Sequence, residues 1–107
     1  MKKIIIDRET WLRGEGKDNS FLLRGSDKKM CCLGFYFNQC GVSEETLLNK
    51  GSPMCLGEAN LPKETLWLRG VAGTLMAIND STYYPEADRE SKIKKIFAEF
   101  GYKVKFR

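Results

Sequence analysis

The chain has 107 residues, of which 42% are hydrophobic and 30% charged, with a formal charge of +4 at pH 7 and a pI near 8.9. This length and composition predict one domain over residues 1–107, with a radius of gyration of about 13 Å, and exclude disordered, collagen-like and coiled-coil classes. The balance of 18 basic to 14 acidic side chains is too mild for a dedicated duplex-DNA binder and has the wrong sign for an acidic mimic of DNA.

Apolar runs and cysteines point to an intracellular protein without a membrane partner. No apolar run approaches the roughly 20 residues of a membrane span, and Ile4–Ile6 is too short for the core of a secretory signal. The cysteines are therefore expected to be reduced, and their spacing lacks the paired Cys-x₂₋₄-Cys pattern of structural zinc sites. We expect no metal and no cofactor, and we assign buried packing roles to Cys31, Cys32, Cys40 and Cys55.

In chain order, the β-branched segment Lys2–Asp7 predicts a strand. A short helix is expected over Arg8–Arg13, because Asp7 can cap it and Gly14 can end it. Residues 14–20 are rich in turn formers and predict a polar loop. The apolar run Phe21–Arg24 fits either a second strand or an extended segment that faces the core.

The segment Lys29–Cys40 predicts a central helix, because its residues leave almost no polar face. Gly34 in its middle costs about 1 kcal/mol relative to alanine, so we expect another backbone segment to approach closely there. Gly41 lies where a helix-ending glycine belongs. A second, shorter helix is expected over Val42–Asn49, with Ser43 as its N-cap.

Residues 50–62 are irregular, and short helices are expected over Leu61–Leu68 and Val71–Ile78. The signals agree best at Pro85–Phe100, where an apolar stripe with helical spacing predicts a longer helix. Alternation over residues 102–107 then predicts a half-buried strand. The expected fold class is α+β, with a short sheet that includes the N- and C-terminal strands, packed against several helices.

An arginine and a glycine follow an apolar pair three times, at Arg13, Arg24 and Arg69. These positions fit the ends of secondary-structure elements, where arginine lies near helical carbonyls and glycine caps. They also fit three guanidinium groups that converge on an anion such as a phosphate.

Two loops supply further candidate binding residues. Glu15 and Lys17 lie in a glycine-containing loop that lacks the spacing of a phosphate-binding motif but can serve in recognition. Tyr83 and Tyr84 precede the basic helix and are the best candidates for stacking on a nucleobase.

Enzymatic chemistry finds little support in the sequence. The chain has no histidine, which excludes Ser-His-Asp and Cys-His catalysis. A helix N-terminus can lower the pKa of a cysteine such as Cys31, and an enzyme that uses Cys31 or Asp80 is the weakest alternative. We assign no catalytic residue.

The chain has a tryptophan-containing Arg-Gly-Glu segment at residues 11–15, a Cys-Cys-Leu-Gly segment at residues 31–34 and an Asn-Asp pair at residues 79–80. In these motifs it resembles a class of small tailed-phage and prophage proteins. The resemblance covers most of the chain except residues 50–70. It brings no established activity or catalytic residues, so none is carried over.

What the resemblance implies is an accessory protein that acts in the cytoplasm of a bacterial host. The expected function is non-enzymatic inhibition of a defence complex, anti-CRISPR-like or otherwise, by occupying the surface of a bacterial protein or ribonucleoprotein. The alternative is a binder or sponge of a nucleotide or other anionic ligand that uses arginine side chains.

Overall fold

The two ends of the chain meet in a two-stranded parallel sheet, β1 (Lys2–Ile6) and β2 (Tyr102–Phe106), in the computed structural model, which describes residues 2–57 and 61–107. Ile4 lies opposite Val104 and Ile6 opposite Phe106, and all four side chains are buried on one face of the sheet. The radius of gyration is 12.5 Å, close to the expectation. The predicted α+β fold with paired terminal strands is confirmed.

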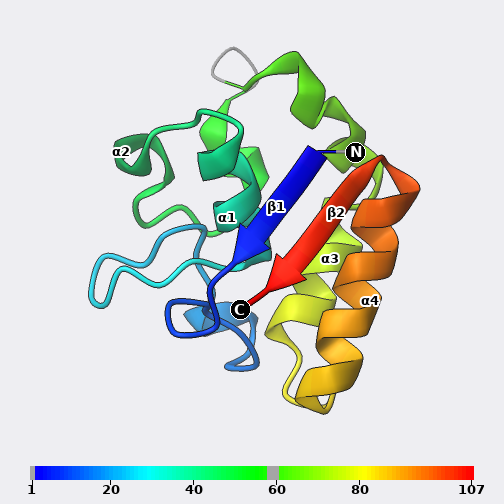
Figure 1. The fold of residues 1–107 in the computed structure, drawn as a ribbon. Coiled ribbons are helices and arrows are strands. Elements are labelled where there is room, and N and C mark those ends of the chain that lie inside the picture. The colour runs from blue at the N-terminus through cyan, green and yellow to red at the C-terminus, as the bar shows by residue number, and fades with distance from the viewer. Residues whose placement is uncertain (1, 58–60) are drawn as a thin grey trace.

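Helices cover only the buried face of the sheet (Figure 1). Helix α1 (Cys32–Gln39) packs on β1, α4 (Glu86–Glu99) packs on β2, and α3 (Ala72–Asp80) contacts both helices. The remaining elements are short: α2 (Glu44–Leu47) and the 3₁₀ segments η1 (Lys17–Asn19), η2 (Pro53–Leu56) and η4 (Lys63–Gly70). No helix among residues 2–57 and 61–107 is long and apolar enough to span a bilayer.

The core centres on Tyr36 of α1, which is fully buried. Its ring lies edge-on to Tyr102 at 5.0 Å and to Trp67 at 5.5 Å, measured between ring centroids. Trp67 Nε1 donates to the Tyr36 hydroxyl at 2.8 Å, and that hydroxyl donates to Tyr102 at 2.8 Å. Aromatic packing and hydrogen bonds between the Trp67 indole N–H and the two tyrosine hydroxyls therefore join α1, η4 and β2.

Gly34 confirms the expected close approach of a backbone. A Cβ at this position would lie 1.8 Å from the carbonyl oxygen of Leu22, so only glycine fits between α1 and that segment. The Phe21–Arg24 run is the extended alternative, and Leu23 forms an isolated bridge with Leu48.

The predicted helix over Arg8–Arg13 is wrong. The chain makes a turn after Asp7, and Trp11 then forms an extended bridge with Met30. Leu12 N donates to Met30 O at 2.8 Å, and Met30 N donates to Thr10 O at 3.0 Å. These long-range backbone bonds let both Trp11 and Leu12 reach the core, which a single solvent-facing helical turn would prevent.

The bounds of several other elements also differ from the predicted bounds. Helix α1 begins at Cys32 rather than Lys29, because Met30 is held in its bridge. The Val42–Asn49 helix is reduced to α2, although Ser43 caps it as expected, with its Oγ accepting from Thr46 N at 3.2 Å. The segment after Pro62 is a 3₁₀ helix that includes Gly70, whereas α4 and β2 match their predictions.

Candidate functional site

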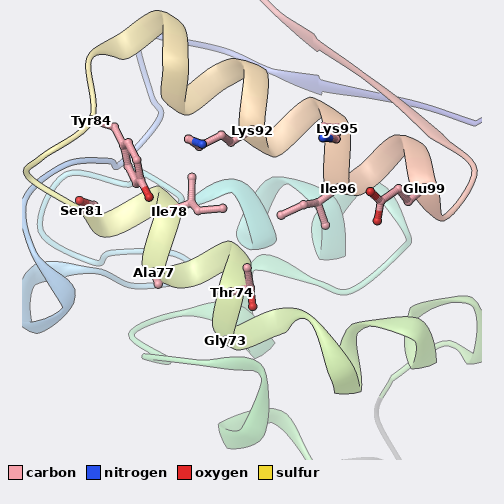
Figure 2. Close-up of a pocket in the computed structure, with 10 residues that line it drawn as sticks. All are labelled: Gly73, Thr74, Ala77, Ile78, Ser81, Tyr84, Lys92, Lys95, Ile96 and Glu99. Carbon is pink, nitrogen blue, oxygen red and sulfur yellow. The ribbon is translucent and has the colours of Figure 1, made fainter.

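Two hollows meet on the exposed side of α3, and we call this region the α3 surface. The first is a groove of about 800 Å³ between α3 and α4, open to solvent along its length (Figure 2). Gly73 and Ala77 lie along its α3 side, and Lys92 and Lys95 along its α4 side. Its full lining is Gly73, Thr74, Ala77, Ile78, Ser81, Tyr84, Lys92, Lys95, Ile96 and Glu99.

The groove combines two cations with several hydroxyl groups. The Lys92 ammonium lies 5.4 Å from the ring centroid of Tyr84, a cation–π distance that orients the lysine over one end of the groove. The lining also contains the carboxylate of Glu99, which lies four residues after Lys95 and therefore next to it on the helix surface. The groove can therefore accept an anionic group near Lys92 while its isoleucines contact an apolar one.

The second hollow is apolar and has a volume of about 540 Å³. It lies between η2, η4 and α3, and Gly73 belongs to both hollows. Two of its lining side chains are exposed although large and apolar: Met54 at 93% and Leu66 at 46%. Its lining is Phe37, Ser52, Pro53, Met54, Leu61, Thr65, Leu66, Leu68, Arg69, Ala72, Gly73 and Met76.

Asn79, at the end of α3, anchors the α3 surface to the rest of the molecule. Its buried Oδ1 accepts from Trp11 Nε1 at 2.8 Å and from Cys32 N at 3.0 Å. Its Nδ2 donates to Leu12 O at 3.0 Å and to Asp80 Oδ1 at 2.9 Å. One amide thus satisfies four partners and fixes α3 against α1 and the segment after β1.

Arg89 fixes the other side of the groove. It is 5% exposed and its guanidinium donates to the carbonyls of Ile78, Ser81 and Tyr84, at 3.3 Å from Nε to Ile78 and 3.2 Å from Nη2 to Tyr84. These bonds join α4 to the last turn of α3 and to the loop between them. The sequence could have indicated this role, because Arg89 lies four residues before the buried Ile93 and therefore on the same face of the helix.

Arg13 and Arg24 take part in internal ion pairs. Arg13 Nε donates to both carboxylate oxygens of Glu86 at 3.1 Å, and its guanidinium lies 4.6 Å from the Trp11 ring centroid. Arg24 Nη2 contacts Asp27 at 2.6 Å and Glu15 at 3.5 Å. The Arg24 guanidinium lowers the pKa of the Asp27 carboxyl to about 2. Both arginines also donate hydrogen bonds to backbone carbonyls, so their side chains stabilise the local fold.

The other candidates are distributed between the α3 surface and separate loops. Arg69 lines the apolar hollow, and Tyr84 lines the groove. Tyr83 is 86% exposed and its ring meets that of Tyr84 edge-on at 5.7 Å. Lys17 is exposed in η1. Lys92 and Lys95 were not among the sequence candidates; their three-residue spacing on the best-predicted helix was the available signal.

The lowered pKa that a nucleophilic Cys31 would need is absent. The thiol accepts backbone N–H groups at the start of α1, which favour the thiolate, but burial dominates and raises its pKa to about 12. Burial also raises the pKa of the nearby Asp80 carboxyl, against hydrogen bonds from Ser20 and Asn79. At neutral pH Cys31 is thus a protonated packing thiol. The buried packing role is confirmed for Cys31 and Cys32, Cys40 is only half-buried, and the buried role expected for Cys55 is wrong because its side chain is exposed.

No family model matches the chain, and comparisons with curated proteins and with solved structures found no match either.

Proposed function

We propose that the protein acts inside a bacterium as a phage-type accessory protein that binds a host defence complex and blocks the surface it covers. The observation that carries this proposal is the α3 surface, where exposed Met54 and Leu66 border an apolar hollow next to a cationic groove. Large apolar side chains left in water around a concave site are typical of protein-binding surfaces.

The chemistry of the α3 surface defines the partner segment that it fits. An apolar side chain of the partner enters the hollow beside Leu66, and a neighbouring carboxylate lies against Lys92 or Lys95. The anchor supplies the affinity, because apolar anchors in desolvated pockets dominate binding energies. Steric blockade needs no chemical step by the protein.

The experiment measures phage plating on bacteria that carry one restriction or CRISPR system at a time. The wild-type protein is expected to restore plaques on a defended host. The variant Met54→Glu/Leu66→Glu places charge at exposed positions of the hollow and is expected to lose at least tenfold of this effect. The matched control, Ser26→Glu/Ser91→Glu, adds the same charge at exposed positions outside both hollows.

Restoration by the wild type and the control, together with loss in the hollow variant, supports the proposal. It is refuted if no defended host regains plaques, or if the hollow variant is as active as the control.

A second candidate function is binding of a nucleotide or other small anion in the groove between α3 and α4. Lys92 and Lys95, with the hydroxyls of Thr74 and Ser81, favour this location. At Arg13 and Arg24 an anion would instead have to displace Glu86 and Asp27. Native mass spectrometry tests the idea: a bound mass of a few hundred daltons should disappear in Lys92→Gln/Lys95→Gln and persist in Lys28→Gln/Lys50→Gln.

A further inference from the structure

The solvent face of the sheet carries three lysines, and we call it the lysine face. Side chains alternate along β2, so Tyr102, Val104 and Phe106 are buried while Lys103 and Lys105 are exposed. The parallel register places Lys3 of β1 directly opposite Lys103, and Ile5 opposite Lys105. Lys3, Lys103 and Lys105 therefore project from one face of two adjacent strands.

The lysine face is open, and its cations have no ion-pair partner in the part of the chain that the structure describes. The helices lie behind the strands in Figure 1 and leave this face uncovered. Within residues 2–57 and 61–107, Lys3, Lys103 and Lys105 form no ion pair, whereas Lys2 at the start of β1 pairs with Glu64. Like charges directly opposite each other destabilise a sheet, so Lys3 and Lys103 impose a cost that a bound anion would relieve.

We propose that the lysine face binds the phosphate backbone of a single nucleic-acid strand. Lys103 and Lys105 are two residues apart on one strand, which separates them by about 6.6 Å. That separation is comparable with the spacing of successive phosphates along an extended nucleic-acid strand. The adjacent β-strand, about 4.8 Å away, adds Lys3. The result is a compact cluster of three cations, two strands wide, that matches one backbone rather than the two of a duplex.

The composition of the lysine face favours a nucleic acid over an acidic protein. Interfaces between proteins are depleted in lysine and enriched in aromatic side chains and arginine, whereas lysine is a common phosphate ligand. The inward alternation buries the aromatic residues of β2, Tyr102 and Phe106. Binding should therefore depend on phosphates and be insensitive to base sequence.

The test is fluorescence anisotropy with a labelled 20-nucleotide oligothymidylate and oligouridylate, titrated with the whole protein at 20 and 200 mM salt. Neutralising three phosphates on a single strand predicts a slope of about −2 in log K against log salt, so binding should weaken about 100-fold over this range. Equal binding of the two probes indicates phosphate recognition, and preference for oligouridylate indicates a contact with the ribose hydroxyl as well.

The variant Lys3→Gln/Lys103→Gln/Lys105→Gln is expected to weaken binding at 20 mM salt at least tenfold. The control Lys28→Gln/Lys50→Gln/Lys63→Gln removes the same charge from exposed positions outside the sheet and should bind within about twofold of the wild type. Far-UV circular dichroism confirms that both variants fold. A polyglutamate peptide of matched charge is the acidic-protein probe.

Three results would overturn the proposal: no binding at 20 mM salt, equal loss in both triple variants, or polyglutamate binding as tightly as the oligonucleotides. The α3 surface is separate from this test, because none of these three lysines lines either of its hollows. A failure of the oligonucleotide test would thus leave the proposed blocking function unaffected. A failure of the plaque test would likewise leave the proposal for the lysine face unaffected.

Discussion

At the residue scale, two glycines in helices differ in whether the structure leaves space for an alanine side chain. A Cβ at Gly34 would lie 1.8 Å from Leu22 O, whereas a Cβ at Gly73 meets nothing within 4 Å. Gly34→Ala is therefore expected to lower the free energy of unfolding by about 3 kcal/mol, the upper end for overpacking. Gly73→Ala should raise it by up to about 1 kcal/mol, because alanine favours helix.

Urea unfolding of both glycine variants measures these changes. The account of the Leu22–Gly34 approach fails if the two alanine substitutions alter stability in the same direction.

The buried amide of Asn79 makes a second prediction at this scale. Asn79→Ala leaves the Trp11 and Cys32 N–H donors and the Leu12 carbonyl without their partner. Each buried group left unsatisfied costs about 1–3 kcal/mol, so the loss should exceed about 3 kcal/mol. Thermal unfolding followed by tryptophan fluorescence measures it. The control Asn19→Ala removes one exposed bond and should change little; similar effects of the two substitutions would contradict the role of Asn79.

At the scale of elements, an ion pair joins the turn after β1 to α4. Arg8 donates to both oxygens of Glu90, at 2.8 and 2.7 Å, and these hydrogen bonds lower the pKa of the Glu90 carboxyl. A carboxyl with a lowered folded-state pKa stabilises the fold above its ordinary value of 4.5, and this stability is lost as the pH falls below that value.

Glu90→Gln should therefore be less stable than the wild type at pH 7, with the difference shrinking as the pH falls from 4.5 toward 3. Urea unfolding across this range provides the measurement, with the exposed Glu45→Gln as control. A difference that stays constant from pH 7 to pH 3 would contradict a contribution from the ionised pair.

The elements also show which parts of the fold the sequence can predict. Helix α4 and strand β2 follow from local signals: Pro85 at the entry, an apolar stripe, Gly101 at the end and strict alternation after it. The segment Arg8–Arg13 was mispredicted because its conformation depends on Met30 and on Asn79, which is 68 residues from Trp11. Local propensity contains no information about such partners.

At the scale of the whole molecule, the candidate site arises from packing between elements. Tyr84 was a sequence candidate and does line the groove, but Lys92 and Lys95 become a site only when α3 packs beside α4. The arginine pattern was visible in the sequence, yet Arg13 pairs with Glu86, which no local rule connects to it, and Arg24 pairs with Glu15 as well as with the neighbouring Asp27. Sequence motifs thus identified candidate residues in loops, whereas the two hollows could be identified only from the tertiary arrangement.

The α3 surface gives this small chain one continuous candidate binding surface. Its apolar hollow and its cationic groove share Gly73, so one partner segment can occupy both. Asn79 and Arg89 hold the two helices that form the groove. Because these supports are buried, the surface is organised before binding, which lowers the entropic cost of association.

The most direct test of this account is quantitative co-purification of the tagged protein from lysate of a bacterium with active defence systems, read by native mass spectrometry. We predict a stoichiometric bacterial protein or ribonucleoprotein partner that is retained by Ser26→Glu/Ser91→Glu and lost by Met54→Glu/Leu66→Glu. A partner retained equally by both variants, or the absence of any stoichiometric partner, would contradict binding through the α3 surface.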